Sequence, residues 1–449
     1  MFPIIFGQDG DIITEDANIF PLTPADKRYS RLYKKEVYDF VGFVLYKNKL
    51  LTVLPKHFYE NRDEEKDKII DDTKILFNVI KKYLLESKSS AVASKYIGPE
   101  MNYESDYPFF EFFGIYNYYK KYGIYKEQEE ILKKNSNGNI SWKDTIRKSP
   151  VVASKNGLVF LDLYSKKKSN INVFISQCMI YIINHTIKSF PYFFNYSPIL
   201  FAESKIDFLK SKEYTLRQLY QYRNLIFKDT DKDLLDLMIS FFEKYNSENN
   251  GGAIHIKINY FDVIWEKMVN KYLNDYFKEV DPKTQMLLFT DKKGEFNRKF
   301  SSKTFEIDKS NHNFSIKPDH YLDEKKTVYI FDSKYYDDVN DLNYKQFAYN
   351  VLISNKTLPE EKIIYSALLL PGKKESKIHL DIADGFRQGN VGSNCIVEQY
   401  LPIKEIMQNY LNLKSWEVGI LLFLLLLSQF KYIYIKMVIS LLRWLMIMN

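Results

Sequence analysis

Cysteine and histidine are scarce in this chain. Of its 449 residues, two are cysteines, Cys178 and Cys395, and six are histidines. Two cysteines cannot form the disulfide framework of a small secreted domain, which fits a reducing compartment. The histidines show no metal-ligand spacing, so a structural zinc site is not expected. The N-terminal residues lack a basic leader with a long apolar core, so we expect no signal peptide and a cytoplasmic protein.

A nucleotide-binding loop and a strong charge imbalance are also missing. No Gly-x-x-x-x-Gly-Lys-Ser/Thr segment occurs, so a nucleotide-driven motor would have to be a separate protein. The 64 Lys and Arg residues against 57 Asp and Glu give a net charge of +7. This is mild for a DNA-binding protein, so positive charge would have to be concentrated locally.

Basic clusters are therefore the weak candidates for DNA contacts. They are Lys27 and Arg28 with Arg31, Lys34 and Lys35; Arg147 and Lys148; Lys166 to Lys168; and Lys292, Lys293, Arg298, Lys299 and Lys303. Taken singly, each cluster is more typical of a solvated surface. Phosphate contacts would supply affinity but no sequence specificity. The aromatic content of 16% is better explained by buried packing than by base stacking.

Long apolar runs are absent except in the C-terminal tail, which opens with ten uncharged residues from Val418 to Leu427. A bilayer-spanning helix needs about 20 apolar residues, and a longer span here would include Lys431. Three interpretations stay open: a membrane tail, a buried terminal helix, or an altered reading frame after about residue 415. The abrupt change of composition favours the third, and a membrane partner is not expected.

The segment from Ser315 to Lys334 contains the residues that point to chemistry. Pro318-Asp319 is followed by Asp332-Ser333-Lys334. Residues 328–336 are β-branched and aromatic, which predicts a strand that places Asp332 and Lys334 on one face. Residues 314–319 are predicted to form the preceding strand, closed by a turn at 323–326. Asp319 would then lie opposite Ile330 and diagonal to Asp332.

Two carboxylates and a lysine in this arrangement suit a phosphodiester. Mg²⁺ prefers oxygen ligands and usually takes one or two carboxylates, which Asp319 and Asp332 can supply. The metal would stabilise charge on the phosphate and lower the pKa of a bound water. Lys334 would stabilise the transition state as a compact charge. The alternative is a solvated hairpin with charges on its wet face.

At these residues the chain resembles the PD-(D/E)XK nuclease superfamily, with Asp319, Asp332 and Lys334 in the motif positions. The resemblance implies an acidic residue on a preceding helix, here Glu266 beside the apolar stripe of 261–272, as a third catalytic and metal-binding group. An ordinary surface glutamate remains the alternative. It also implies supporting roles for Gln346 and Tyr349, three apart on a helix predicted over 341–349.

A narrower resemblance rests on residues further upstream. A predicted hairpin joins residues 39–46 to 50–56, and Gly138-x-Ile-x-Trp142-x-x-Thr145-Ile146 precedes 157–163. This ordered set resembles the LlaJI-type restriction endonucleases, which are similar to McrC-like nuclease subunits of GTP-dependent restriction systems. The resemblance runs from about residue 35 to about 412.

The predicted fold class is mixed α/β, with a PD-(D/E)XK nuclease core in which helices flank a mixed central sheet. We expect an N-terminal module over residues 1–100 with a β-hairpin and a helix, a largely helical domain over 101–250, and the nuclease domain over 251–415. The apolar tail covers 416–449. The polar segment 246–252 is the predicted domain boundary, and target recognition is expected upstream of it.

The resemblance implies Mg²⁺-dependent double-strand cleavage of foreign DNA by a type II-like site-specific deoxyribonuclease, as phage defence. It implies double-stranded DNA and a cognate DNA methyltransferase as partners, with a McrB-like GTPase and a homodimer left open. The alternatives are an McrC-like subunit that needs a GTPase motor, a non-catalytic DNA-binding or assembly subunit, and an exonuclease or repair nuclease.

Overall fold

The computed structural model describes most of the chain. The described residues are 3–59, 68–88, 103–155, 157–171, 174–191, 193–194, 199, 206–245, 253–308, 314–336, 339, 341–357, 362–383 and 395–412. The predicted boundary at 246–252 and the apolar tail lie outside them. The chain divides into two compact units, one made of residues 1–105 with 251–449 and the other of residues 106–250.

The first unit contains a five-stranded sheet in the order β1-β5-β4-β12-β6. The predicted N-terminal hairpin is confirmed as β4 (Val41–Tyr46) and β5 (Lys49–Leu54). β1 (Ile4–Gln8) runs parallel to β5, and β12 (Ile254–Ile258) pairs between β4 and β6 (Tyr103–Ser105). Strands from residues 1–105 and a strand that follows residue 251 therefore form one sheet, which a local pattern could not reveal.

A smaller hairpin of β2 (Lys27–Ser30) and β3 (Lys35–Tyr38) adjoins this sheet. Short 3-10 helices at Glu15–Ile19 and Pro24–Asp26 precede it. Asp26 pairs with Lys257 of β12 at 2.7 Å, and both side chains are buried. The helix α1 (Ile69–Lys88) is the helix expected in the N-terminal module.

The second sheet of this unit has the order β17-β18-β19-β21-β20. Its strands are β17 (His320–Asp323), β18 (Thr327–Ser333), β19 (Ile363–Pro371), β20 (Glu375–Asp381) and β21 (Cys395–Leu401). The three central strands are parallel and the two edge strands antiparallel. The mixed α/β fold class is thus confirmed.

Three helices accompany this sheet: α7 (Asp262–Tyr276), α8 (Tyr344–Thr357) and α9 (Ile403–Tyr410). Val328 and Ile330 of β18 pack with Tyr349 and Ile353 of α8. Phe331, on the opposite face, stacks on the Phe300 ring and meets the Phe277 ring edge to face. Because β18 is covered on both faces, it is apolar along its length up to Asp332. Short pairs β13 (Phe277–Val280) with β14 (Leu287–Phe289) and β15 (Phe305–Glu306) with β16 (Ser315–Ile316) complete this region.

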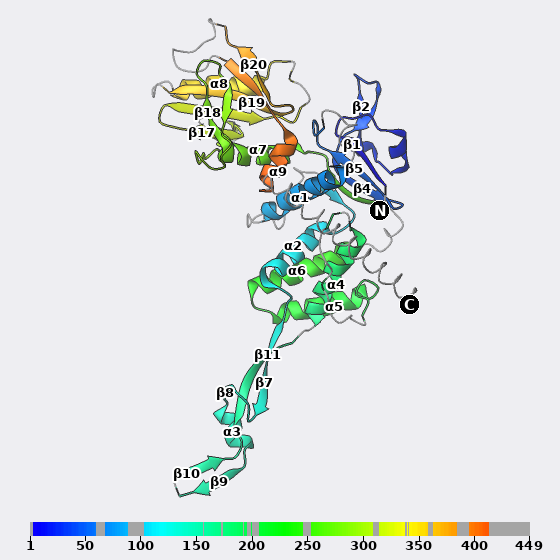
Figure 1. The fold of residues 1–449 in the computed structure, drawn as a ribbon, viewed down its shortest axis with the longest axis vertical. Coiled ribbons are helices and arrows are strands. Elements are labelled where there is room, and N and C mark those ends of the chain that lie inside the picture. Colours follow the sequence, from blue (N-terminus) through cyan, green and yellow to red (C-terminus); the bar gives the residue numbers. More distant parts are fainter. Residues whose placement is uncertain are drawn as a thin grey trace, which may run out of the picture. The chain divides into compact units, whose positions relative to one another are not determined.

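The second unit combines helices with a strand arm (Figure 1). Its longer helices are α2 (Phe109–Tyr122), α4 (Phe174–Ser189), α5 (Lys212–Leu225) and α6 (Asp229–Lys244). Phe109, Phe112 and Phe113 are buried among them, as expected for packing rather than base stacking. β7 (Glu127–Lys134) pairs with β11 (Tyr164–Ile171), and the chain between them forms β8 (Asn139–Ile140), α3 (Trp142–Lys148), β9 (Val151–Ser154) and β10 (Gly157–Phe160).

Within the described residues, no helix is both long and apolar enough to cross a membrane.

Candidate active site

The hairpin that carries Asp319 and Asp332 differs in register from the prediction. The strand that pairs with β18 is β17, over 320–323, and not 314–319. Pro318 has no N–H to donate to a ladder, and the turn tightens to residues 324–326 through a hydrogen bond from the Glu324 N–H to the Thr327 carbonyl. His320 therefore lies opposite Phe331, which brings Asp319 level with Asp332 rather than with Ile330.

Asp332 is fully buried near the end of β18, and two lysines share its carboxylate. Lys334 pairs with its Oδ2, and Lys345 lies 3.5 Å from its Oδ1. β18 ends at Ser333, earlier than predicted, and the Lys334 N–H donates to the Leu369 carbonyl at 2.9 Å. The backbone thus still fixes Lys334 beside Asp332, on the side expected from strand alternation.

Asp319 and Asp332 form a coupled pair. The Asp319 Oδ2 accepts the Ser333 N–H at 3.0 Å. Burial and the charge of Asp332 raise the pKa of Asp319 from 3.8 to about 8. Burial also acts to raise the pKa of Asp332, but Lys334 and Lys345 outweigh it and the pKa is lowered. The two carboxylates therefore interact strongly, and positive charge beside them is favoured.

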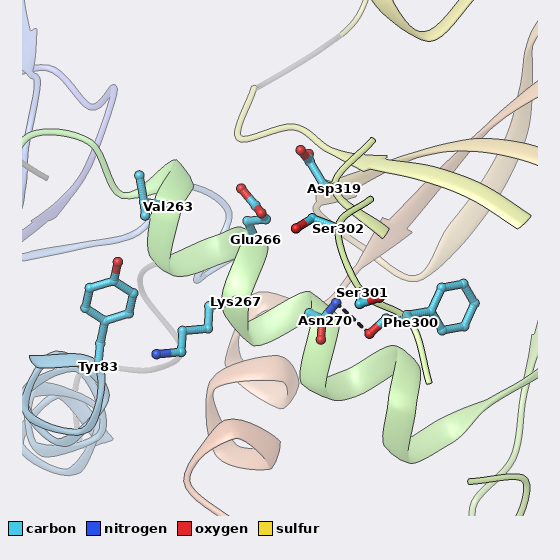
Figure 2. Close-up of a pocket in the computed structure, with 9 residues that line it drawn as sticks. All are labelled: Tyr83, Val263, Glu266, Lys267, Asn270, Phe300, Ser301, Ser302 and Asp319. Carbon is cyan, nitrogen blue, oxygen red and sulfur yellow. Dashed lines mark hydrogen bonds between the residues drawn. The ribbon is translucent and has the colours of Figure 1, made fainter. Parts of the chain in front are cut away.

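Glu266 lies on α7 at the edge of a cavity of about 370 Å³ that Asp319 also lines. Figure 2 shows Glu266 on α7 facing the segment that carries Asp319, with Ser302 near both carboxylates. Burial, followed by the charge of Asp332, raises the pKa of Glu266. No group of three His, Cys, Asp or Glu residues in the described ranges is gathered closely enough to hold a metal. The structure therefore brings Asp319 and Asp332 together and leaves Glu266 nearby.

α8 brings the two predicted supporting residues against the hairpin. The Gln346 Nε2 donates to the Ile330 carbonyl at 2.8 Å, and Gln346 is fully buried. The Tyr349 hydroxyl donates to the Lys317 carbonyl at 2.9 Å. Both hydrogen bonds end on backbone atoms of the segments that carry Asp319 and Asp332, so Gln346 and Tyr349 tie α8 to those segments.

Lys345 is the residue that sequence reasoning missed. Its ammonium lies 3.5 Å from the Asp332 Oδ1 and 5.4 Å from the centroid of the Tyr349 ring. Its side chain is 50% exposed, whereas that of Lys334 is 12% exposed. Burial acts to lower the pKa of Lys345, but the charges of Asp332 and Asp319 raise it overall. The one signal available in the sequence was the spacing of four residues between Lys345 and Tyr349, which places both on one helical face.

The N-terminus of α8 is held by a histidine and a glutamate from the sheet. The Asn343 N–H donates to His379 Nε2 at 3.4 Å, and His379 Nδ1 lies 2.7 Å from Glu398 Oε1. The Asn343 Oδ1 in turn accepts the Gln346 N–H at 2.9 Å. Polar contacts from β20 and β21 therefore hold the helix end that presents Lys345.

His320, next to Asp319, contacts other polar groups inside the protein. It is fully buried, with Nε2 2.7 Å from the Ser333 hydroxyl and Nδ1 3.1 Å from the Asn270 amide. Burial lowers its pKa to about 3. On the far side of Lys334, the Tyr335 hydroxyl accepts the Lys56 N–H at 2.8 Å, and its ring packs on Phe261. Both ends of the Asp332–Lys334 segment are therefore anchored.

The basic residues between 292 and 303 have different environments. Arg298 pairs with Glu324 and donates to the Lys278 carbonyl, so its guanidinium is held by the protein itself. Lys293 donates to Asn412 Oδ1 at 2.7 Å, and Lys303 lies over the rings of Phe305 and Tyr321. The side chains of Lys292 and Lys299 are exposed. Arg298, Lys299 and Lys303 also line a cavity of about 470 Å³. Their DNA contacts stay a prediction.

Comparisons with known proteins place the chain in a family. No curated protein matches the sequence. A chain in the refined half-complex of Thermococcus gammatolerans McrB AAA+ hexamers with bound McrC is similar over 91% of this chain and 99% of its own, at 10% identity and a TM-score of 0.37. A chain of the T. gammatolerans McrBC complex is similar over 59% of this chain and 85% of its own, at 11% identity and a TM-score of 0.20.

A family model gives the more specific result. The model of the LlaJI restriction endonuclease matches residues 40–379, which include the hairpin of β17 and β18 with Asp319, Asp332 and Lys334. Membership in a restriction endonuclease family supports a nuclease role. This chain belongs to the LlaJI restriction endonuclease family.

Proposed function

We propose that this chain is a Mg²⁺-dependent nuclease of the PD-(D/E)XK type that makes double-strand cuts in foreign DNA. The observation that carries the proposal is the pairing of Asp319 and Asp332 at the end of β18, with Lys334 against the Asp332 carboxylate. Two buried carboxylates in contact repel each other, so such a pair is costly unless a cation or proton lies between them.

The chemistry of the two carboxylates fits Mg²⁺. They offer hard oxygen donors, and a raised Asp319 pKa of about 8 indicates a place where positive charge is favoured. Asp319 and Asp332 would hold the ion, and Glu266 would bind one of its waters across the pocket. The chemistry that Mg²⁺ supplies when bound is charge neutralisation at the phosphate and activation of water. A cation that uses two carboxylates and several waters does not require a cluster of three acidic ligands.

The chain's own residues supply the rest of the chemistry. Lys334, held by the backbone contact to Leu369, presents one positive charge to the scissile phosphate. Lys345 presents a second, more exposed charge from α8. Glu266, whose pKa is raised by burial, is placed to accept or hold a proton of the attacking water.

The finer assignment is a type II-like site-specific deoxyribonuclease in a restriction system with a cognate DNA methyltransferase, acting on phage DNA in the cytoplasm. Family membership and the intact Asp319, Asp332 and Lys334 set support it. A non-catalytic DNA-binding subunit is disfavoured, because a site that no longer acts would be expected to lose at least one of these residues. A second copy of the chain would supply the cut in the opposite strand.

A second candidate function is an McrC-like nuclease subunit that acts only with a separate GTPase. The observation that favours it is the arm of the second unit, on which Trp142, Ile146 and Leu158 are 56%, 61% and 67% exposed. Large apolar side chains exposed in one region are typical of a protein-binding surface. The arm would dock on the motor protein, since the chain contains no phosphate-binding loop of its own.

The test is incubation of the purified chain with unmodified circular plasmid and Mg²⁺, beside the Asp332→Ala variant. Discrete double-strand cuts that vanish in the variant are expected. Degradation from ends alone, or equal activity of both proteins, contradicts the proposal. Activity that appears only when a GTPase and GTP are added supports the second candidate.

A further inference from the structure

The hairpin of β2 and β3 carries a concentration of positive charge that the proposed active site does not use. Its residues 27–35 contain five cations and no acidic residue. We propose that the tip of this hairpin, residues 29–35, is a duplex-DNA contact in which cations bind phosphates and apolar side chains enter a groove. The inference rests on the proposed function for its choice of ligand, and its test does not depend on cleavage.

The base of the hairpin is held rigidly. Val37 and Tyr38 are fully buried, and the backbone of this strand bonds to residues 10, 11 and 13 of the preceding segment. Asp26, directly before β2, forms the buried pair with Lys257. The tip therefore projects from a fixed support, so binding would cost little ordering entropy.

Charges at the base and at the tip are arranged differently. Lys27 pairs with Glu36 at 3.2 Å, and Arg28 pairs with Asp39 at 3.0 Å. Arg31, Lys34 and Lys35 form no ion pair within the described residues, and all three are exposed or half-exposed. The net charge available to a ligand is thus concentrated at the turn, where no carboxylate neutralises it.

The same turn exposes large apolar side chains. Leu32 is 82% exposed, Tyr29 64% and Tyr33 51%. The Tyr33 N–H donates to the Ser30 hydroxyl, which folds the turn so that these residues remain outside the core. Burial of these side chains against a ligand would therefore be favourable by about 25 cal/mol per Å² of apolar area.

Duplex DNA matches both properties at once. The major groove is about 12 Å wide and admits a two-stranded β-ribbon, and apolar wedges enter the minor groove of bent DNA. Three cations around an apolar tip would contact phosphates on both sides of a groove. An anionic membrane surface would also attract this chemistry, and the experiment separates the two.

The test measures binding of the full chain to a fluorescent duplex by anisotropy, in EDTA so that no cleavage occurs. The variant Lys34→Ala with Lys35→Ala is compared with Lys47→Ala with Lys49→Ala. The control is matched, because Lys34 and Lys47 both occupy left-handed turn positions and Lys35 and Lys49 both begin the following strand. Thermal melts check that both variants fold.

We expect the first variant to bind at least tenfold more weakly and the control to bind as the wild type does. The slope of log K against log salt should fall by about 2 in the first variant, since each lost phosphate contact removes about 0.9. Leu32→Ser should weaken binding with an unchanged salt slope, because it removes no charge. Equal affinities of the two double variants, or no duplex binding by the wild type, would overturn the inference.

Two further measurements separate the outcomes. Cleavage of plasmid at low salt by the Lys34 and Lys35 variant tests the proposed function independently, because excess enzyme compensates for weaker binding. Loss of cleavage in Asp332→Ala with normal anisotropy would leave the hairpin inference intact. Binding of the wild type to phosphatidylserine vesicles, lost in the first variant while duplex binding persists, would assign the hairpin to a membrane surface and contradict the inference.

Discussion

Two hairpins of the first unit, β17–β18 and β2–β3, handle charged side chains in opposite ways. In the first, Asp332 is fully buried, and Asp319 beside it has a pKa raised to about 8. In the second, cations and a leucine project into solvent from a rigid base. A buried charge interacts strongly with the few groups that touch it, whereas an exposed charge is screened. The first arrangement suits a reaction at a single phosphate. The second suits electrostatic attraction of many phosphates along a DNA duplex.

The largest effect is expected at the buried hairpin. Asp332→Asn should lower plasmid cleavage at least 1000-fold, because it removes the carboxylate that both lysines contact and that would hold Mg²⁺. The matched control is Asp323→Asn at the other end of the same hairpin. The Asp323 carboxylate lies 2.7 Å from the Lys362 ammonium and takes no part in the proposed site. Initial rates at saturating Mg²⁺ measure both. A similar loss in the two variants would contradict the assignment.

A smaller effect is expected at Lys345. Lys345→Ala should lower kcat about 10- to 100-fold, because it removes a charge next to the reacting phosphate, while Lys345→Arg should retain more activity. Lys362→Ala, which removes another paired lysine of the same unit, serves as control. A change in KM alone would show that Lys345 attracts DNA without assisting the reaction. Its role would then be the one proposed for the cations of the hairpin of β2 and β3.

A third prediction concerns the buried hydrogen bond by which Gln346 holds β18 of the first hairpin. Gln346→Leu removes the hydrogen bond to the Ile330 carbonyl and should lower the free energy of unfolding by about 1–3 kcal/mol. Tyr344→Ala, at an exposed position of the same helix, should change it by less than about 0.5 kcal/mol. Urea titrations monitored by circular dichroism provide the values. Equal free energies of unfolding for Gln346→Leu and the wild type would contradict the proposal that this hydrogen bond holds β18 in place.

A pH-dependent effect is expected at Asp9, next to the base of the hairpin of β2 and β3. Burial raises the pKa of Asp9 from 3.8 to about 7, with Lys56 opposing it. A raised folded pKa favours the protonated form, so this contribution to stability is present below pH 4 and is lost as pH rises through 7. Asp9→Asn should therefore be more stable than the wild type at pH 8, by up to about 4 kcal/mol for a pKa difference of about three units. Melting temperatures from pH 4 to 8 test this, with Asp16→Asn as the exposed control. A constant difference across that range would contradict it.

Local patterns predicted the elements of the site well. The helix α7 and the strand β18 form within a few residues of their predicted bounds, whereas α8 (Tyr344–Thr357) extends eight residues beyond the predicted helix. The predicted register of the hairpin that carries Asp319 and Asp332 was wrong. The register depends on how tightly the turn at 324–326 closes and on Pro318, which lies outside the paired strand. The pairing of β12 with β4 was not predicted, since strand partners about 210 residues apart leave no periodic signal.

The sequence by itself determined which chemistry is available: two aspartates and a lysine at the end of an apolar strand, and a run of cations without acids near the N-terminus. Tertiary structure decided how these groups act. Packing of α8 against β18 places Lys345 beside Asp332, and burial of the pair sets the raised pKa of Asp319. Residue types fix the charges, but only folding fixes their distances and their access to water, on which electrostatic energy depends.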